Sequence, residues 1–138
     1  MPRFFTWREA QRELPRIAGL VREAVERHTR FRESERALQD ISRRITMLGG
    51  VSLDRAWALE TRRARDRCAA SLNEAIERVQ ETGCVLKDLE MGLIDFPALY
   101  HGQEVCLCWK LGEPAIEYWH GTDEGFAGRK PIDGDFPG

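Results

Sequence analysis

The sequence contains no long hydrophobic run and only a few cysteines. Its longest apolar stretches are a few residues long, too short for a transmembrane helix, and its first ten residues include no apolar segment of signal-peptide length. We therefore expect a cytoplasmic protein. The four cysteines, Cys68, Cys84, Cys106 and Cys108, form no CxxC pair, and in the cytoplasm they are expected to remain free thiols.

The sequence also lacks the short motifs that identify common enzyme classes. It has no phosphate-binding glycine loop, no GxSxG nucleophile elbow, no HExxH pair and no EF-hand loop. No internal repeat is visible. These absences leave the reaction class open, and the sequence does not decide whether the protein is an enzyme.

Lysine is absent from the first 82 residues, which carry 17 arginines against 13 acidic residues, a net charge of +4. Residues 83–138 carry 4 basic and 10 acidic residues, a net charge of −6. Acidic residues interleave with the arginines, which is typical of solvated helix surfaces with salt bridges. Nucleic-acid binding requires a patch of one sign, so we do not expect a nucleic-acid partner. The lack of a long apolar run predicts that no membrane is involved either.

The length of 138 residues is that of one domain with its own hydrophobic core. Apolar residues first recur at helical spacing and then occur in short runs separated by glycine and proline. This order predicts an α+β fold in a single domain, residues 1–138. We expect a long antiparallel helical hairpin over residues 1–82, an antiparallel sheet of three to four strands over residues 83–120, and an irregular tail over residues 121–138 that packs through Phe126 and Ile132.

The predicted helical hairpin is indicated by its caps and its apolar spacing. Thr6 and Glu9 form a capping box at the start of the first helix, and Pro15 predicts a kink or a restart near Leu14. Apolar residues then recur in steps of three and four as far as Leu48, which is typical of a coiled coil. Gly49-Gly50 ends this helix, Ser52 or Asp54 caps the next, and Gly83 ends the second.

The predicted sheet has strands near residues 84–88, 92–96, 103–110 and 115–120, and Pro97 is expected to end the second of them. A two-residue turn at Gly112-Glu113 would place Trp109 opposite Ile116 and Cys108 opposite Glu117. In that register, Tyr118 and His120 share a face with Val105, while Trp119 shares the other face with Cys106. An odd loop length would exchange the two faces.

A cluster of polar residues among aromatic ones predicts a ligand site on the sheet, formed by Asp95, Glu117, His120 and Arg129. Asp95, Glu117 and His120 are candidate ligands of a divalent metal ion, although Glu117 and His120 would meet only at a bulge or a strand end. No catalytic residue is assigned.

Each of these residues also has a structural interpretation. Asp95 caps a turn in that interpretation, and Arg129 pins the tail by pairing with Asp95 or Glu117. Cys106 and Cys108 share a strand face, where they are either small apolar residues or soft-metal ligands together with His120 or His101.

Several segments resemble a bacterial family known as domain-of-unknown-function family 2203. They are Lys87–Glu90, Gly92–Pro97, Cys108–Glu113, Trp119-His120 and Gly125–Arg129, with Phe5-Thr6, Glu9-Ala10 and Leu14-Pro15 near the start. The resemblance covers nearly the whole chain. It implies a bacterial cytosolic origin and agrees with the predicted fold, but it implies no activity.

Two functions follow as hypotheses. The helices carry more apolar surface than one small sheet can cover, which favours a self-associating interaction or structural module, most simply a homodimer. The alternative is a small metal- or ligand-binding protein or enzyme, with the polar site on its sheet.

Overall fold

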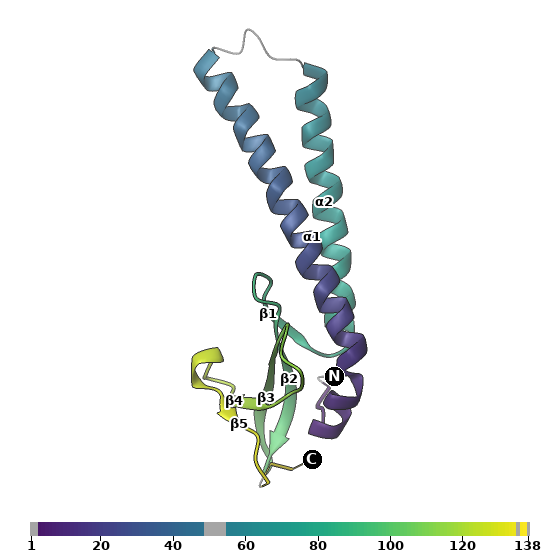
Figure 1. Cartoon of the computed structure of the whole chain (residues 1–138), viewed down its shortest axis with the longest axis vertical. Coiled ribbons are helices and arrows are strands. Elements are labelled where there is room, and N and C mark those ends of the chain that lie inside the picture. The colour runs from purple at the N-terminus through teal and green to yellow at the C-terminus, as the bar shows by residue number, and fades with distance from the viewer. Residues whose placement is uncertain (1–2, 49–54, 135, 138) are drawn as a thin grey trace.

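The computed structural model describes residues 3–48, 55–134 and 136–137. Two helices are followed by one antiparallel sheet of five strands in the order β1-β2-β3-β4-β5 (Figure 1), which confirms the predicted α+β fold. The helices are α1 (Trp7–Leu48) and α2 (Arg55–Glu81). The strands are β1 (Val85–Asp88), β2 (Leu93–Tyr100), β3 (Gln103–Lys110), β4 (Tyr118–Gly121) and β5 (Lys130–Pro131).

The capping box at the start of α1 is confirmed. The backbone N–H of Glu9 donates to Oγ1 of Thr6 at 3.1 Å, and the Thr6 hydroxyl donates to Oε1 of Glu9 at 3.2 Å. Of the kink or restart predicted near Leu14, the restart is wrong, because α1 continues through Pro15 as one helix, and the kink stays a prediction. Pro15 is exposed, so water can bond the backbone carbonyl that proline leaves without an intrahelical donor.

The two helices pack as an antiparallel hairpin at the end that carries the sheet. Ile17, Val21 and Ala24 of α1 are fully buried, as are Ala75 and Val79 of α2. Towards the far end of the hairpin the helices diverge (Figure 1). Of the seam residues there, Ile41 is buried and Leu38 is half-buried, whereas Ile45 and Trp57 are exposed. The predicted turn and caps at Gly49-Gly50, Ser52 and Asp54 lie outside the described residues.

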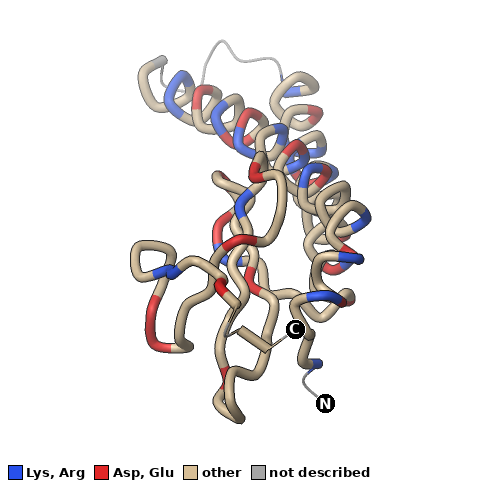
Figure 2. Tube along the Cα trace, turned by 60° about the horizontal axis from the view of Figure 1, so that its bottom comes forward, with Lys and Arg blue, Asp and Glu red and all other residues tan. Residues whose placement is uncertain are grey.

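Basic and acidic residues alternate along both helices, whereas most of the charged residues of the sheet and of the segments that follow it are acidic (Figure 2). Ion pairs join the two helices, as between Arg65 and Glu35 at 3.2 Å. No helix in the described ranges is both long enough and apolar enough to span a membrane.

The face of the sheet that packs on the helices, its inner face, forms the main hydrophobic core. Phe96 lies at its centre, with no exposed surface, and its ring meets that of Phe5 edge-on at a centroid distance of 5.1 Å. The alternation of side chains along β2 and β3 places the other inner residues on this face. They are Ile94, Ala98, Val105, Leu107 and Trp109.

The prediction that Pro97 ends a strand is wrong, since β2 continues to Tyr100. β1 pairs with β2 only as far as the Val85–Asp95 pair, so no strand lies beside Pro97 on that side. The Pro97 carbonyl accepts a hydrogen bond from the Phe5 backbone N–H at 2.7 Å. Proline has no backbone N–H to donate, and on this side of β2 no neighbouring strand offers an acceptor that would require one.

The predicted register between β3 and β4 is wrong by one residue. Cys106 lies opposite His120 and Cys108 opposite Tyr118, instead of opposite Glu117. The loop is longer than two residues because Glu113 anchors it: its carbonyl accepts from Nε1 of Trp109 at 3.0 Å, and its carboxylate accepts from the Lys110 backbone at 2.7 Å. The shift exchanges the faces, so Tyr118 and His120 join Cys106 on the outer face.

The tail is more ordered than the sequence indicates. Residues Lys130–Pro131 form β5 beside β4, and Ile132 packs against the core as expected. Phe136, which was not expected to pack, is only 8 % exposed and contacts the rings of Tyr100 and Trp119. Strand β5 escapes prediction because only pairing with β4 stabilises so short a segment.

Candidate metal centre

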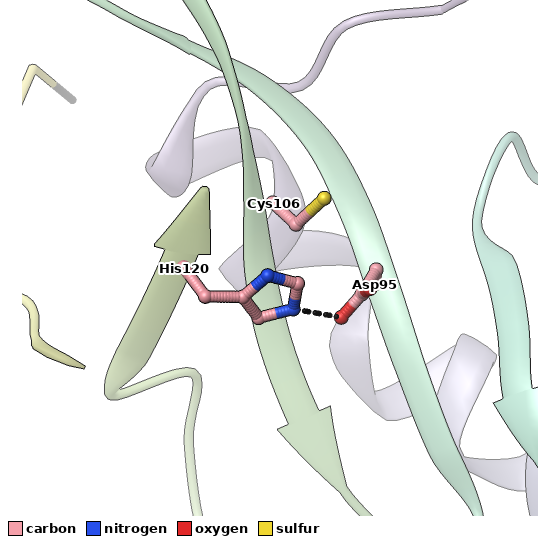
Figure 3. Close-up of side chains that lie close together, drawn as sticks. All are labelled: Asp95, Cys106 and His120. Atoms are coloured by element: carbon pink, nitrogen blue, oxygen red, sulfur yellow. Dashed lines mark hydrogen bonds and ion pairs between the residues drawn. The ribbon is translucent and has the colours of Figure 1, made fainter. Parts of the chain in front are cut away.

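Three side chains from three neighbouring strands meet on the outer face of the sheet. Asp95 comes from β2, Cys106 from β3 and His120 from β4; the side chains of Asp95 and His120 point towards each other, and that of Cys106 lies beside them (Figure 3). One potential ligand atom from each lies within 4.8 Å of the other two. The register explains this, because Cys106 pairs directly with His120, and Asp95 lies two residues along β2 from Pro97, the other partner of Cys106, and so on the same face.

Burial makes this cluster unusual. Asp95 is 1 % exposed and His120 is 3 % exposed, while Cys106 is half-buried. Oδ1 of Asp95 lies 3.0 Å from Nε2 of His120, but the other carboxylate oxygen, Oδ2, has no hydrogen-bond partner within the described part of the chain. Buried carboxylates are normally paired at both oxygens, so this oxygen indicates an incomplete site.

Both ring nitrogens of His120 face hydrogen-bond acceptors. Nδ1 lies 2.8 Å from the carbonyl oxygen of Gly121, and Nε2 lies 3.0 Å from the Asp95 carboxylate. A neutral imidazole has one donor and one acceptor nitrogen, so it cannot satisfy both contacts. The arrangement needs a doubly protonated ring, a proton on Asp95, or a cation between Nε2 and the carboxylate.

The environment of Cys106 does not favour a nucleophile. Burial is the largest effect and, with the negative charge of Asp95, raises the pKa of the Cys106 thiol from 9.0 to about 11. The thiol is therefore protonated at neutral pH unless a metal ion displaces the proton. Both nitrogens of His120 are already engaged, so the ring is not free to act as a base for this thiol.

The structure does not bring the other two predicted site residues into the cluster. Glu117 is exposed and precedes β4. Arg129 lies on the outer face, but it makes a bidentate ion pair with Glu113 at 3.0 and 2.8 Å. Its guanidinium carbon lies 4.0 Å from the ring centroid of Tyr118 and 4.2 Å from that of Phe126. Arg129 pins the tail, as its structural interpretation proposed, but through Glu113.

Cys106 was considered as a ligand only in a set with Cys108. Cys108 is fully buried on the same face, and its pKa is likewise raised to about 11, first by burial and then by Asp95. It is not part of the three-residue cluster; its sulfur lies 4.0 Å from Nη1 of Arg129. The alternation of side chains along β3 was a usable signal, but the register error placed His120 on the opposite face.

Comparison with known protein families gives a match over most of the chain. The model of a family described as uncharacterized conserved protein (DUF2203) matches residues 3–132. The chain belongs to this family. No curated protein and no solved structure matches.

The segments that carry the resemblance to the family converge in space. Asp95, Cys108, Glu113, His120 and Arg129 each come from one of them, and all five side chains lie on or beside the outer face. Two sets of contacts link them. His120 contacts Asp95, and Arg129 contacts both Cys108 and Glu113. The inner face, by contrast, holds the hydrophobic core.

The ion pair between Glu113 and Arg129 predicts a measurable dependence of stability on pH. Burial raises the pKa of Glu113, but the hydrogen bonds from Arg129 and Lys110 outweigh it, so the pKa lies below its ordinary value of 4.5. The stabilisation is therefore present above pH 4.5 and is lost as the pH falls through the lowered folded-state pKa. Glu113→Gln should lower the free energy of unfolding at pH 7 by about 1.5–3 kcal/mol.

Urea denaturation at pH 7 and at acidic pH checks this prediction. The difference between the wild type and Glu113→Gln should shrink as the pH falls below 4.5. Glu104→Gln is the matched control, because Glu104 is exposed on the same face. A Glu113→Gln penalty that does not change with pH would contradict the assignment to an ion pair.

Proposed function

We propose that the protein binds a divalent transition-metal ion, with zinc as the best fit, through Asp95, Cys106 and His120. The proposal is based on buried polar atoms of the cluster whose hydrogen-bonding capacity is not satisfied. One oxygen of Asp95 has no partner among the described residues, and both nitrogens of His120 face acceptors. A cation at this point would give Oδ2 of Asp95 a partner and would bind Nε2 of His120 in place of a proton.

The donor set favours zinc. One imidazole nitrogen, one thiolate sulfur and one carboxylate oxygen form a mixed set of ligands that suits Zn²⁺. Two such atoms bound to one tetrahedral zinc ion at about 2.0–2.1 Å lie about 3.3 Å apart, so the 3.0 Å between Asp95 and His120 must lengthen by a few tenths of an ångström to admit the ion. The Gly121 carbonyl would accept from Nδ1 of His120 and so leave Nε2 unprotonated for the metal.

The competing interpretation is a purely structural pair of an imidazolium and a carboxylate. It accounts for the contact between Asp95 and His120, but it leaves Oδ2 of Asp95 without a partner and gives Cys106 no role. A reduced cysteine ligand also agrees with a cytoplasmic location, where we place the protein.

Metal binding can be tested with the chelator-stripped protein reloaded with Zn²⁺ or Co²⁺. We expect one ion per chain by native mass spectrometry, and a thiolate-to-cobalt charge-transfer band in the near ultraviolet. Cys106→Ser should abolish the band. It should also weaken binding by more than the roughly 10- to 100-fold loss typical of outer-shell changes, because it removes a ligand.

Cys108→Ser is the matched control, because Cys108 lies two residues away on the same face of β3. It should keep both the charge-transfer band and the stoichiometry. The proposal fails if neither ion binds, or if Cys106→Ser and Cys108→Ser behave alike.

A second candidate function is self-association through the far end of the hairpin. Four of the large apolar side chains that are exposed in the described residues gather there: Ile45, Met47, Trp57 and Leu59. An open groove lies between the diverging helices and is lined by Leu38, Ile41, Ser42, Ile45, Ala58, Leu59 and Arg62. A second copy of the chain is the occupant we propose, because a homodimer buries this patch on both subunits at once.

Analytical ultracentrifugation over a range of salt concentrations tests the dimer. Residues 38–48 and 55–67 carry seven arginines against three acidic residues, so salt should strengthen the dimer by screening repulsion between like charges. Leu59→Glu should give a monomer, while Leu99→Glu, at an exposed site on β2, should not. A wild type that stays monomeric at every salt concentration would rule out this function.

A further inference from the structure

A cavity of about 270 Å³ lies between the two helices, away from the candidate metal centre. Two residues of α1 and four of α2 line it, and we call it the arginine cavity: Arg27, Arg30, Ala64, Arg67, Cys68 and Ser71. The four α2 positions follow the spacing i, i+3, i+4 and i+7, so they share one face of that helix. The arginine cavity therefore belongs to the interface of the hairpin.

The charged side chains that line the arginine cavity are all positive. Three arginines line it, and no acidic side chain among the described residues does, although basic and acidic residues alternate along both helices. Acidic residues outside the lining pair with two of the three, Glu23 and Glu74 with Arg27, and Glu60 with Arg67. Arg30 makes no hydrogen bond or ion pair with any residue that the structure describes, so its charge is available to a ligand.

Arg27 is already held in place at the wall of the cavity. Its side chain is only 19 % exposed and pairs with Glu23, and Nη1 donates to the backbone carbonyl of Ser71 across the hairpin at 2.9 Å. A guanidinium group has five N–H donors, and these two contacts leave others unused. Because the side chain is ordered beforehand, it loses little conformational freedom when an anion binds.

The α2 side of the cavity supplies the remaining contacts. Arg67 pairs with Glu60 at 2.9 Å, but both side chains are more than half exposed, and exposed pairs of this kind are weak enough to exchange partners. The Ser71 hydroxyl makes no hydrogen bond with a described residue, so it is free to donate to a ligand. Ala64 and Cys68 are half-buried and form an apolar part of the wall.

We propose that the arginine cavity binds the phosphate group of a small phosphomonoester. Guanidinium groups bind phosphate oxygens through paired N–H donors, and several of them suit a group with two negative charges and three terminal oxygens better than a carboxylate. Ala64 and Cys68 would contact the apolar part of the ester. The volume of about 270 Å³ is just below the range of roughly 300–1,000 Å³ for drug-sized ligands, which favours a small molecule. This inference is independent of the metal site.

The test is a titration of the full chain with phenyl phosphate at pH 8 and constant ionic strength, followed by ¹H–¹⁵N NMR. We expect saturable shifts of the backbone amides of Ala64, Cys68 and Ser71. Inorganic phosphate should bind less tightly, because it has no apolar group, and acetate should bind least tightly. Equal affinities for phenyl phosphate and inorganic phosphate would overturn the role of the apolar wall.

Arg30→Gln should weaken the binding of phenyl phosphate by about three- to fivefold, the size typical of an exposed ion pair. It should leave folding unchanged, since Arg30 has no partner among the described residues. Arg22→Gln is the matched control, because Arg22 is an exposed arginine of α1 that does not line the cavity. It removes the same charge and should leave the affinity unchanged.

Three outcomes would overturn the proposal. They are the absence of a saturable response to phenyl phosphate, equal effects of Arg30→Gln and Arg22→Gln, and shifts spread along both helices instead of gathered at the cavity. The last two would show that the arginines attract anions without forming a site.

Discussion

Replacing His120 with alanine is expected to lower the free energy of unfolding of the metal-free protein by about 3–5 kcal/mol. His120 is the only hydrogen-bond partner of the Asp95 side chain within the described residues. Both side chains, taken without their backbone atoms, are almost completely buried, that of His120 at 4 % exposed and that of Asp95 at 2 %. Removing the ring leaves a buried carboxyl group with no partner for either oxygen. Urea denaturation in the presence of a chelator measures the effect without contribution from metal.

Two further variants distinguish the contribution of the Asp95–His120 interaction from that of the packing of the two side chains. Asp95→Asn should cost less than His120→Ala, because a neutral amide is cheaper to bury and its NH₂ group can donate to Nε2 of His120. The double variant Asp95→Leu/His120→Leu should recover much of the lost stability, since apolar residues often replace a buried ion pair at little cost. A His120→Ala penalty below 1 kcal/mol would show that Asp95 does not depend on His120.

Replacing Phe96 with alanine is expected to lower the free energy of unfolding by about 3–5 kcal/mol. Phe96 is the largest of the fully buried side chains, and it lies at the centre of the inner face. Its removal leaves a cavity between β2 and the helices and also removes the edge-on contact with Phe5. Thermal or urea denaturation followed by circular dichroism measures the loss.

Leu99→Ala provides the matched control on the same strand. Leu99 is 45 % exposed, so the substitution should change stability by no more than about 0.5 kcal/mol. If the two variants lost similar stability, the inner face would not be the main hydrophobic core.

The helices could be predicted from the sequence because the signals are local. The capping contact between Thr6 and Glu9 spans four residues, and the apolar spacing repeats within each turn. Pro15 shows the limit of such reasoning. Its effect depends on whether the residue faces water or the sheet, and the sequence near it does not contain that information.

The sheet register could not be predicted because it depends on one side chain in a loop. Glu113 bonds Lys110, Trp109 and Arg129, and these contacts set the loop length between β3 and β4. Arg129 lies 16 residues further along the chain, so no local pattern reveals this anchor. An error of one residue in the loop then assigned every β4 side chain to the wrong face.

The candidate site was predicted in part for the same reason. Asp95 and His120 were selected by residue type, and the structure places them in contact. Glu117 was selected on the same ground, and it lies outside the cluster. Cys106 became a member of the cluster with them only once the register was known, since its place opposite His120 is a property of strand pairing.

The contact between Phe5 and Pro97 has a consequence for solubility. β2 extends beyond its neighbour β1, and an uncovered strand edge can pair with the edge of another molecule and start aggregation. Here Pro97 offers no backbone donor, and its carbonyl is occupied by the Phe5 N–H. The backbone of Phe5 therefore covers this edge of β2. Deleting residues 1–6 should expose the edge and promote strand pairing between molecules.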